Sequence, residues 1–210
     1  MACAVPGRDC PLCPRLVDYR HQQRDLHRDW FNAPVPSFGD EDAELLIVGL
    51  APGVQGANRT GRPFTGDFAG ELLYGTLVKF GFASGTFRAD PADGLRLNAA
   101  MITNAVRCVP PQNKPTPAEI KTCNGFLAAQ IAALPRLRAM VALGRIAHDA
   151  VLSARRLRKS QFAFGHGASH DLGDLRLFDS YHCSRYNTNT GVLTQSMFEN
   201  VFKAVHAYLG

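Results

Sequence analysis

The segment AELLIVGLAPGVQGANRTGRPFTGD, residues 43–67, decides the fold of this chain. It opens with a short apolar run, Ala43–Leu50, that stands between acidic residues and a Gly-Pro loop. Such a run predicts a strand that is buried on both faces, as strands of parallel sheets are. Ala99–Asn104 and Ala139–Leu143 repeat the pattern, so we expect them to be further strands of the same sheet.

Helices are predicted between these strands. The capping-box sequence Thr116–Glu119, with proline at the first helical position, opens a helix toward Leu134. Ser196 and Glu199 form a second such box at the start of an amphipathic C-terminal helix. Residues 14–30 carry many charges around sparse apolar positions and are predicted to form a solvated helix.

The alternation of strands and helices determines the predicted fold class. It implies an α/β fold, a three-layer α/β/α sandwich with a central, mostly parallel four-stranded sheet. The helix predicted directly after the quoted segment is weakened by Gly70 and Gly75. In open sheets of this kind ligands bind beyond the carboxyl ends of the strands, so the segments after Leu50, after Asn104 and before Ser184 are expected to converge on one site.

Composition limits the possible classes of protein. A chain of 210 residues with 46% hydrophobic content predicts a single domain over residues 1–210. The formal charge of +5 suits a polyanionic partner without requiring one, and the basic run Arg155–Lys159 is interpreted as a solvated helix face. The chain has no N-terminal signal pattern and no run of about 18 apolar residues, so we expect a cytoplasmic protein without membrane contact.

Cysteine spacing suggests one metal centre. Its candidate ligands are Cys10, Cys13, Cys108 and Cys123. In a reducing compartment four such thiolates suit a structural zinc ion or a [4Fe-4S] cluster, and their spacing does not separate the two. Alternatively, the two downstream cysteines are core thiols and the C-x2-C pair is incidental. Cys3 and Cys183 are interpreted as bystanders, although Cys3 can replace the first ligand.

The loop of the quoted segment combines conformational freedom with chemistry. Its glycines, which allow close approach of the backbone to a ligand, are Gly49, Gly53, Gly56, Gly61 and Gly66. The loop lacks the Gly-Lys-Ser/Thr ending of a P-loop. Phe64 can stack on a flat base and Asp67 supplies a carboxylate, with Asn58 and Arg59 beside them. Alternatively, Phe64 packs into the core and Asp67 caps the next helix.

Two further segments carry polar side chains. Asn104 ends its strand, where an amide can pair with a pyrimidine edge at O4 and N3–H, or can be a buried structural residue. The Asn- and Thr-rich segment Tyr181–Gly191 is predicted to be a loop. It holds His182, together with Ser184 as a candidate phosphate ligand and Arg185 as a residue that can enter a duplex.

Together these segments resemble the uracil-DNA glycosylase superfamily, and most closely its fifth family, the type-B enzymes with broad base specificity. The motifs that carry the resemblance are CPLC (10–13), GLAPGVQGANRTGRPFTGD (49–67), ITNAVRC (102–108), VALG (141–144) and HCSRYNTNTG (182–191). Apolar Leu50 and Ala51 stand where other glycosylase families place an acidic or amide residue, which points to the fifth family. The usual His-Pro-Ser appears here as His182-Cys183-Ser184, and the loss of proline frees a backbone N–H and the φ angle.

The resemblance implies a role for each site residue. Phe64 would stack on the flipped base, Asn104 would read its edge, and His182 would donate to the pyrimidine O2. Asp67 would orient or activate water. Further substrate contacts are expected at Gly49, Ala51, Gly53, Asn58, Ser184 and Arg185. The cysteine arrangement is similar to that of the cluster-bearing fourth and fifth families, which favours [4Fe-4S] over zinc.

The implied function is base-excision repair. The protein would act as a monomer on DNA, flip out uracil and other deaminated bases such as hypoxanthine and xanthine, and hydrolyse the glycosidic bond to leave an abasic site. One alternative is a non-catalytic nucleic-acid-binding module stabilised by its metal. Another is a nucleoside hydrolase that acts on free nucleosides.

Overall fold

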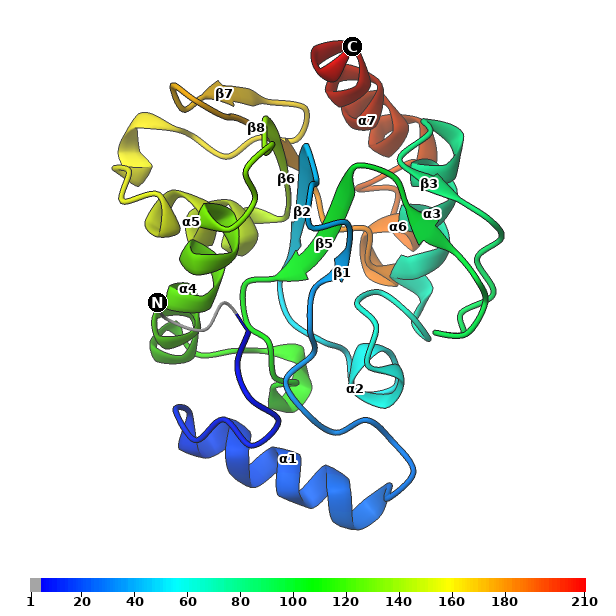
Figure 1. The fold of residues 1–210 in the computed structure, drawn as a ribbon, viewed down its shortest axis with the longest axis vertical. Coiled ribbons are helices and arrows are strands. Elements are labelled where there is room, and N and C mark those ends of the chain that lie inside the picture. Colours follow the sequence, from blue (N-terminus) through cyan, green and yellow to red (C-terminus); the bar gives the residue numbers. More distant parts are fainter. Residues whose placement is uncertain (1–4) are drawn as a thin grey trace.

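The structure, a computed structural model, describes residues 5–210, and Figure 1 shows a central sheet with helices around it. The strands are β1 (Phe38–Gly39), β2 (Leu45–Gly49), β3 (Ala83–Ser84), β4 (Arg96–Leu97), β5 (Ala100–Asn104), β6 (Ala139–Leu143), β7 (Ser169–Asp171) and β8 (Arg176–Ser180). The α-helices are α1 (Pro14–Leu26), α2 (Ala57–Thr60), α3 (Phe68–Lys79), α4 (Pro117–Ala132), α5 (Arg145–Ala154), α6 (Arg185–Asn189) and α7 (Gln195–Leu209). Two 3-10 turns, η1 (Pro111–Asn113) and η2 (Lys159–Gln161), complete the fold.

The main sheet has six strands in the order β1-β5-β2-β6-β8-β7. Its four central strands are parallel, as predicted, and β1 and β7 add antiparallel edges. The strand count of four is therefore corrected to six. The edge strands are only two and three residues long, too short to show the burial period by which a strand is recognised in sequence.

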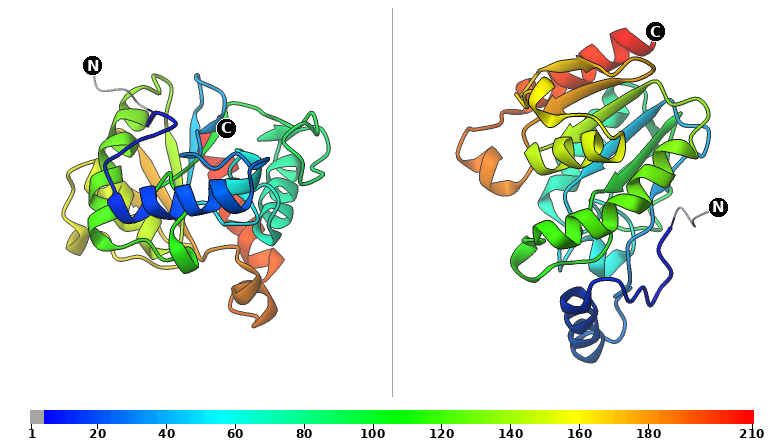
Figure 2. Two further views of the ribbon diagram at one scale, coloured as in Figure 1. Left: turned by 90° about the horizontal axis from the view of Figure 1, so that it is seen from below. Right: turned by 90° about the vertical axis from the view of Figure 1, so that its left-hand side faces the viewer.

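The core lies on both faces of this sheet. Every residue of β2, β5 and β6 is buried, as expected for parallel strands covered on both sides. Leu45 and Ile47 belong to the apolar cluster that includes α3 and α7, whereas Leu46 and Val48 belong to the cluster that includes α4 and α5. The alternating side chains of one strand thus hold together the three predicted layers, which are visible in Figure 2.

One predicted helix start is confirmed and another is corrected. Thr116 and Glu119 form the predicted capping box of α4, and Glu119 also pairs with Arg15 at 2.7 Å. The cap of α7 is Thr194 and not Ser196, because the Thr194 hydroxyl accepts the backbone N–H three residues later. The prediction placed the start of this helix two residues too late.

Two other predicted segments are corrected, and the helix predicted after Gly66 is confirmed. α1 ends at Leu26 rather than at residue 30. Directly after the helix, the Asn32 amide donates to the carbonyl of His27 at 2.6 Å. α3 is continuous despite its glycines, and Gly70 is required because a Cβ there would lie 1.9 Å from the carbonyl oxygen of Phe64. The expected loop 181–191 contains the short helix α6.

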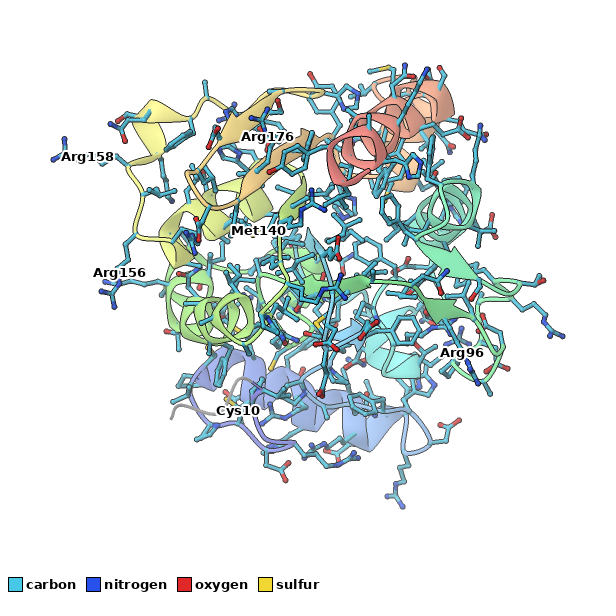
Figure 3. All side chains as sticks on the ribbon, turned by 45° about the horizontal axis from the view of Figure 1, so that its top comes forward. Cys10, Arg96, Met140, Arg156, Arg158 and Arg176 are labelled. Carbon is cyan, nitrogen blue, oxygen red and sulfur yellow. The ribbon has the colours of Figure 1, made fainter. Side chains whose placement is uncertain are left out.

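The basic run is not a helix face. α5 ends at Ala154, and Arg156 adopts a positive φ of 57° in the turn that follows. Arg156 and Arg158 extend outward from this turn in Figure 3 and are exposed. Across residues 5–210, no helix combines the length and apolar character needed to cross a bilayer.

Candidate active site

Segments that follow three parallel strands enclose one cavity. The loop after β2 supplies Phe64 and Asp67. The last residue of β5 is Asn104, and His182 follows β8. The cavity is lined by Ala51, Pro52, Gly53, Ala57, Phe64, Asp67, Ala69, Asn104 and His182. About 260 Å³ of atom-free space, part of it open to solvent, lies between them, which suits one small ring better than a large ligand.

Gly49 lets two of these side chains meet. It ends β2 opposite Asn104 in the parallel register. A Cβ atom at this position would lie 2.4 Å from Asn104 Oδ1 and 2.6 Å from Phe64 Cζ, well inside van der Waals contact. Asn104 is only 3% exposed, so it cannot move aside without displacing its neighbours. A residue without a side chain is therefore needed here to hold the amide and the aromatic ring together.

Asp67 lies at the N-cap position of α3, and its side chain lines the cavity. It makes no close capping hydrogen bond, and its buried Oδ1 has no partner among residues 5–210. A Cβ at Gly56 would lie 2.3 Å from Asp67 Oδ2, and one at Gly53 would lie 3.1 Å away. Burial raises the pKa of Asp67, and the backbone N–H groups of Ala69 and Gly70 oppose this shift. The carboxylate is thus poorly solvated, as a group that interacts with a reacting centre would be.

His182 lies opposite the aromatic ring. The centroids of the His182 and Phe64 rings are 6.0 Å apart, with 29° between their planes. Burial lowers the pKa of His182 to about 4, so the imidazole is neutral at pH 7 and has one N–H to donate. The Asn187 amide donates to the His182 carbonyl at 2.8 Å, and Cys183 is fully buried in the core. These contacts hold the loop in place without the proline of the family pattern.

The backbone of Phe64 is strained and is held by a clamp that the sequence did not reveal. Its φ of 54° lies in the left-handed region, which is rare for an aromatic residue. The Tyr74 hydroxyl donates to the carbonyl of Pro63 at 2.7 Å. Arg62 donates to both oxygens of Asp93, each at 2.8 Å, and this ion pair is buried. Because Asp93 is 31 residues from Arg62, no local pattern signals the pair.

Comparison with known proteins identifies the family. Residues 36–206 match the sequence profile of the Uracil DNA glycosylase superfamily. The chain is 48% identical to the Type-5 uracil-DNA glycosylase of Thermus thermophilus over 198 residues, which cover 91% of this chain and 90% of that protein. It is 39% identical to the Type-5 enzyme of Pyrobaculum aerophilum over 206 residues, covering 96% and 90%.

The chain belongs to the type-5 branch of the uracil-DNA glycosylase superfamily. A more distant relative is the Type-4 uracil-DNA glycosylase of Archaeoglobus fulgidus, 39% identical over 124 residues, which cover 59% of this chain and 54% of that protein. The resemblance read from the motifs is therefore confirmed.

Four residues predicted for the glycosylase site do not line its cavity: Gly49, Asn58, Ser184 and Arg185. Gly49 instead packs against Asn104 and Phe64, which do line it. Asn58 is buried and donates to the Asn32 side chain at 2.9 Å, so it connects the loop to the segment after α1. The Ser184 hydroxyl caps α6 by accepting a backbone N–H at 3.3 Å. Arg185 is exposed, and its guanidinium lies 5.2 Å from the centre of the Phe68 ring. The structure gives Asn58 and Ser184 structural contacts, and leaves the roles of Ser184 and Arg185 on DNA as predictions.

The four predicted metal ligands line a second cavity, which is separate from the active-site cavity. Cys10, Cys13, Cys108 and Cys123 all border it, between α1, the segment after β5 and α4. Ala51 lines the active-site cavity and also packs against the thiol cluster. The five described cysteines are unpaired thiols; Cys183 lies away from the cavity, and Cys3 lies outside the described residues.

Two arginines are buried beside these thiols. Arg20 is 2% exposed and Arg107 is 1% exposed, and both line the cavity. Arg20 donates to Cys108 Sγ at 3.7 Å, and the backbone N–H of Arg107 donates to Cys123 Sγ at 3.3 Å. Among the described residues, Nε of each arginine and Nη2 of Arg107 have no hydrogen-bond partner. Cationic groups in this position favour a centre that carries negative charge.

Proposed function

We propose that this protein removes uracil from DNA by flipping the nucleotide and hydrolysing its N-glycosidic bond. The observation that carries the proposal is the convergence of Phe64, Asp67, Asn104 and His182 on one small cavity at the carboxyl ends of the strands. Membership of the type-5 branch supports the reaction. The glycosidic bond of a stacked base is inaccessible, so the nucleotide must leave the duplex at a cost of a few kcal/mol.

Base recognition would use the apolar and amide groups of the cavity. The Phe64 ring, 6% exposed, offers a stacking surface. Asn104 offers one donor and one acceptor, the pattern that matches uracil N3–H and O4. Gly49 keeps these two groups close, so the same pocket would bind the face and the edge of one ring.

Two side chains would divide the chemistry. Glycosidic cleavage passes through a state with positive charge on the sugar and negative charge on the departing base. His182, neutral because burial lowers its pKa to about 4, would donate its N–H to the O2 of the base. Asp67 would stabilise the sugar cation and orient the attacking water. The residues of one chain complete this site, so we propose that the protein acts as a monomer.

The pocket also bears on the choice of base. Ala51 lines the cavity at a position where other glycosylase families have an acidic or amide side chain. Such a polar side chain would favour bases with one hydrogen-bonding pattern, and alanine does not. We propose that stacking and shape therefore carry more of the recognition, and that hypoxanthine and xanthine are excised as well as uracil. Excision of uracil alone from a panel of modified duplexes would refute this extension.

We propose that the second cavity holds a [4Fe-4S] cluster. A single tetrahedral zinc ion with sulfur at about 2.3 Å brings its ligands to about 3.8 Å from one another. Within residues 5–210, no three of the thiols lie within 4.8 Å of one another. The one group of potential ligands that does meet this limit consists of His148, His170 and Asp179. The wider spacing fits a cluster, and its negative charge would offset Arg20 and Arg107.

The cluster would have a structural role. Four thiolates leave no open coordination position, so it would tie the N-terminal segment to the regions after β5 and within α4. Iron and acid-labile sulfide at about four each per chain, with broad visible absorption, are expected for protein purified without oxygen. Stoichiometric zinc without iron under the same conditions would refute the cluster.

A gel assay tests the enzymatic proposal. Duplexes with uracil, a thymine mismatch, hypoxanthine or xanthine are incubated with the protein, and alkali then cleaves the abasic sites. We expect Asp67→Asn to lower single-turnover excision about ten- to a thousand-fold with little loss of DNA binding. Asp42→Asn, at an exposed position, is the control. Binding without excision would indicate a non-catalytic module, and release of uracil from free deoxyuridine alone would indicate a nucleoside hydrolase.

A further inference from the structure

A group of side chains between α5, β7 and β8 has the chemistry of a metal site. His148 Nδ1 lies 2.8 Å from Asp179 Oδ1, and His170 Nε2 lies 3.0 Å from Asp179 Oδ2. Each of the three offers a ligand atom within 4.8 Å of the other two. We propose that His148, His170 and Asp179 bind one divalent metal ion of the zinc class, at a site separate from the active site and from the thiol cavity.

The site joins three elements that are distant in sequence. His148 lies in α5, His170 in β7 and Asp179 in β8. His148 and Asp179 are 1% and 0% exposed, and His170 is partly exposed. The aromatic rings of Phe162 and Phe164 pack edge-on against the two imidazoles. The donors are therefore held in place in apolar surroundings, with access through His170.

Either a proton or a metal ion must lie between His148 Nδ1 and Asp179 Oδ1. Among the described residues, the ion-pair partners of Asp179 are the two histidines, with no lysine or arginine. His148 Nε2 lies 2.9 Å from the carbonyl oxygen of Phe162, which can only accept, so Nε2 carries the hydrogen. Nδ1 then faces the carboxylate with a lone pair, unless a second proton or a metal ion lies between them.

The surroundings of His148 match those of a metal ligand. Metal-bound histidines usually donate their other ring N–H to a carbonyl or carboxylate, as His148 does to Phe162. Tetrahedral ligands at about 2.0–2.1 Å from a zinc ion are about 3.3–3.4 Å apart. The two N–O separations of 2.8 and 3.0 Å are hydrogen-bond distances, so the three side chains would need to separate by only about 0.3–0.6 Å to hold an ion. Two imidazoles and a carboxylate suit Zn²⁺, Fe²⁺, Co²⁺ or Ni²⁺ better than Mg²⁺ or Ca²⁺.

A metal here would anchor the strand that leads to the active site. Asp179 is three residues before His182. The backbone of Asp179 also accepts the N–H of Gly167 at 2.9 Å, and its side chain accepts that of Gly165 at 3.4 Å. The ion would thus fix β8 and the segment after η2 to α5. Its role is structural.

Cobalt titration of the full-length protein, with its thiol site loaded as purified, tests the proposal. Wild-type protein should bind one equivalent of Co²⁺ with weak ligand-field bands and no sulfur-to-cobalt charge-transfer band. His170→Gln, which changes the partly exposed ligand, should weaken this binding about 10- to 100-fold or more. His21→Gln, at an exposed histidine, is the control and should bind as the wild type does.

A second readout covers the case in which a variant folds poorly. Zn²⁺ should raise the unfolding temperature of wild type and His21→Gln but not of His170→Gln. Equal Co²⁺ binding by wild type and His170→Gln would overturn the proposal, as would charge-transfer absorption from every bound cobalt. The absence of any saturable binding to folded wild-type protein would show that a proton occupies the position between His148 and Asp179.

Discussion

Replacing Gly49 with alanine should disable the site with little change elsewhere. The new Cβ would lie 2.4 Å from Asn104 Oδ1 and 2.6 Å from Phe64 Cζ, whereas ordinary contacts begin at 3.4 Å. The amide must therefore shift by 3.4 − 2.4 = 1.0 Å and the ring by 3.4 − 2.6 = 0.8 Å. A misplacement of about 1 Å costs about 100-fold in rate, which corresponds to about 2.7 kcal/mol. Overpacking should also lower the free energy of unfolding by about 1–3 kcal/mol.

Single-turnover excision of uracil from a duplex measures the first effect, and urea unfolding measures the second. The control is Gly75→Ala, because a Cβ at Gly75 has no heavy atom within 4 Å. Alanine inside α3 should stabilise the fold by about 0.5–1 kcal/mol and leave excision unchanged. If Gly49→Ala cleaves as fast as wild type, then the contact of Gly49 with Asn104 and Phe64 does not set the geometry of the pocket.

Three further predictions follow from buried groups. Asp93→Asn leaves the Arg62 guanidinium without its charge partner and should lower the free energy of unfolding by about 3–5 kcal/mol in urea titrations; a loss below about 1 kcal/mol would contradict the clamp. His182 has a pKa of about 4 when folded and about 6.5 when unfolded, so the unfolded chain binds more protons between these values and stability should rise with pH across that window. His182→Asn should remove this part of the slope, and an unchanged slope would refute the assignment. Burial raises the pKa of Asp67, so the rate of single-turnover excision should fall on acidification at a higher pH than an ordinary aspartate would give. An acidic midpoint of the pH–rate profile at or below the pKa of an ordinary aspartate would argue against a catalytic role for this carboxylate.

Local sequence was sufficient for much of the architecture. Apolar runs such as Ala43–Leu50 predict buried parallel strands, because a strand covered on both faces has no polar side to show. The capping box at Thr116 is complete within four residues and appears as predicted. Asp67, Asn104 and His182 could be proposed from their positions after strands, since the carboxyl ends of parallel strands meet at one edge of the sheet.

Tertiary structure decided the contacts that join distant segments. The sequence shows that Gly49 is flexible, but only the fold shows that it must be small, because Asn104 and Phe64 both pack against it. Asn58 could not be separated from the site residues until its partner across the loop was known. The Arg62–Asp93 clamp likewise has no local signal. Secondary structure is determined largely by residues that are close in sequence. The positions of the side chains in a site depend on contacts between residues that are distant in sequence, and only packing brings these together.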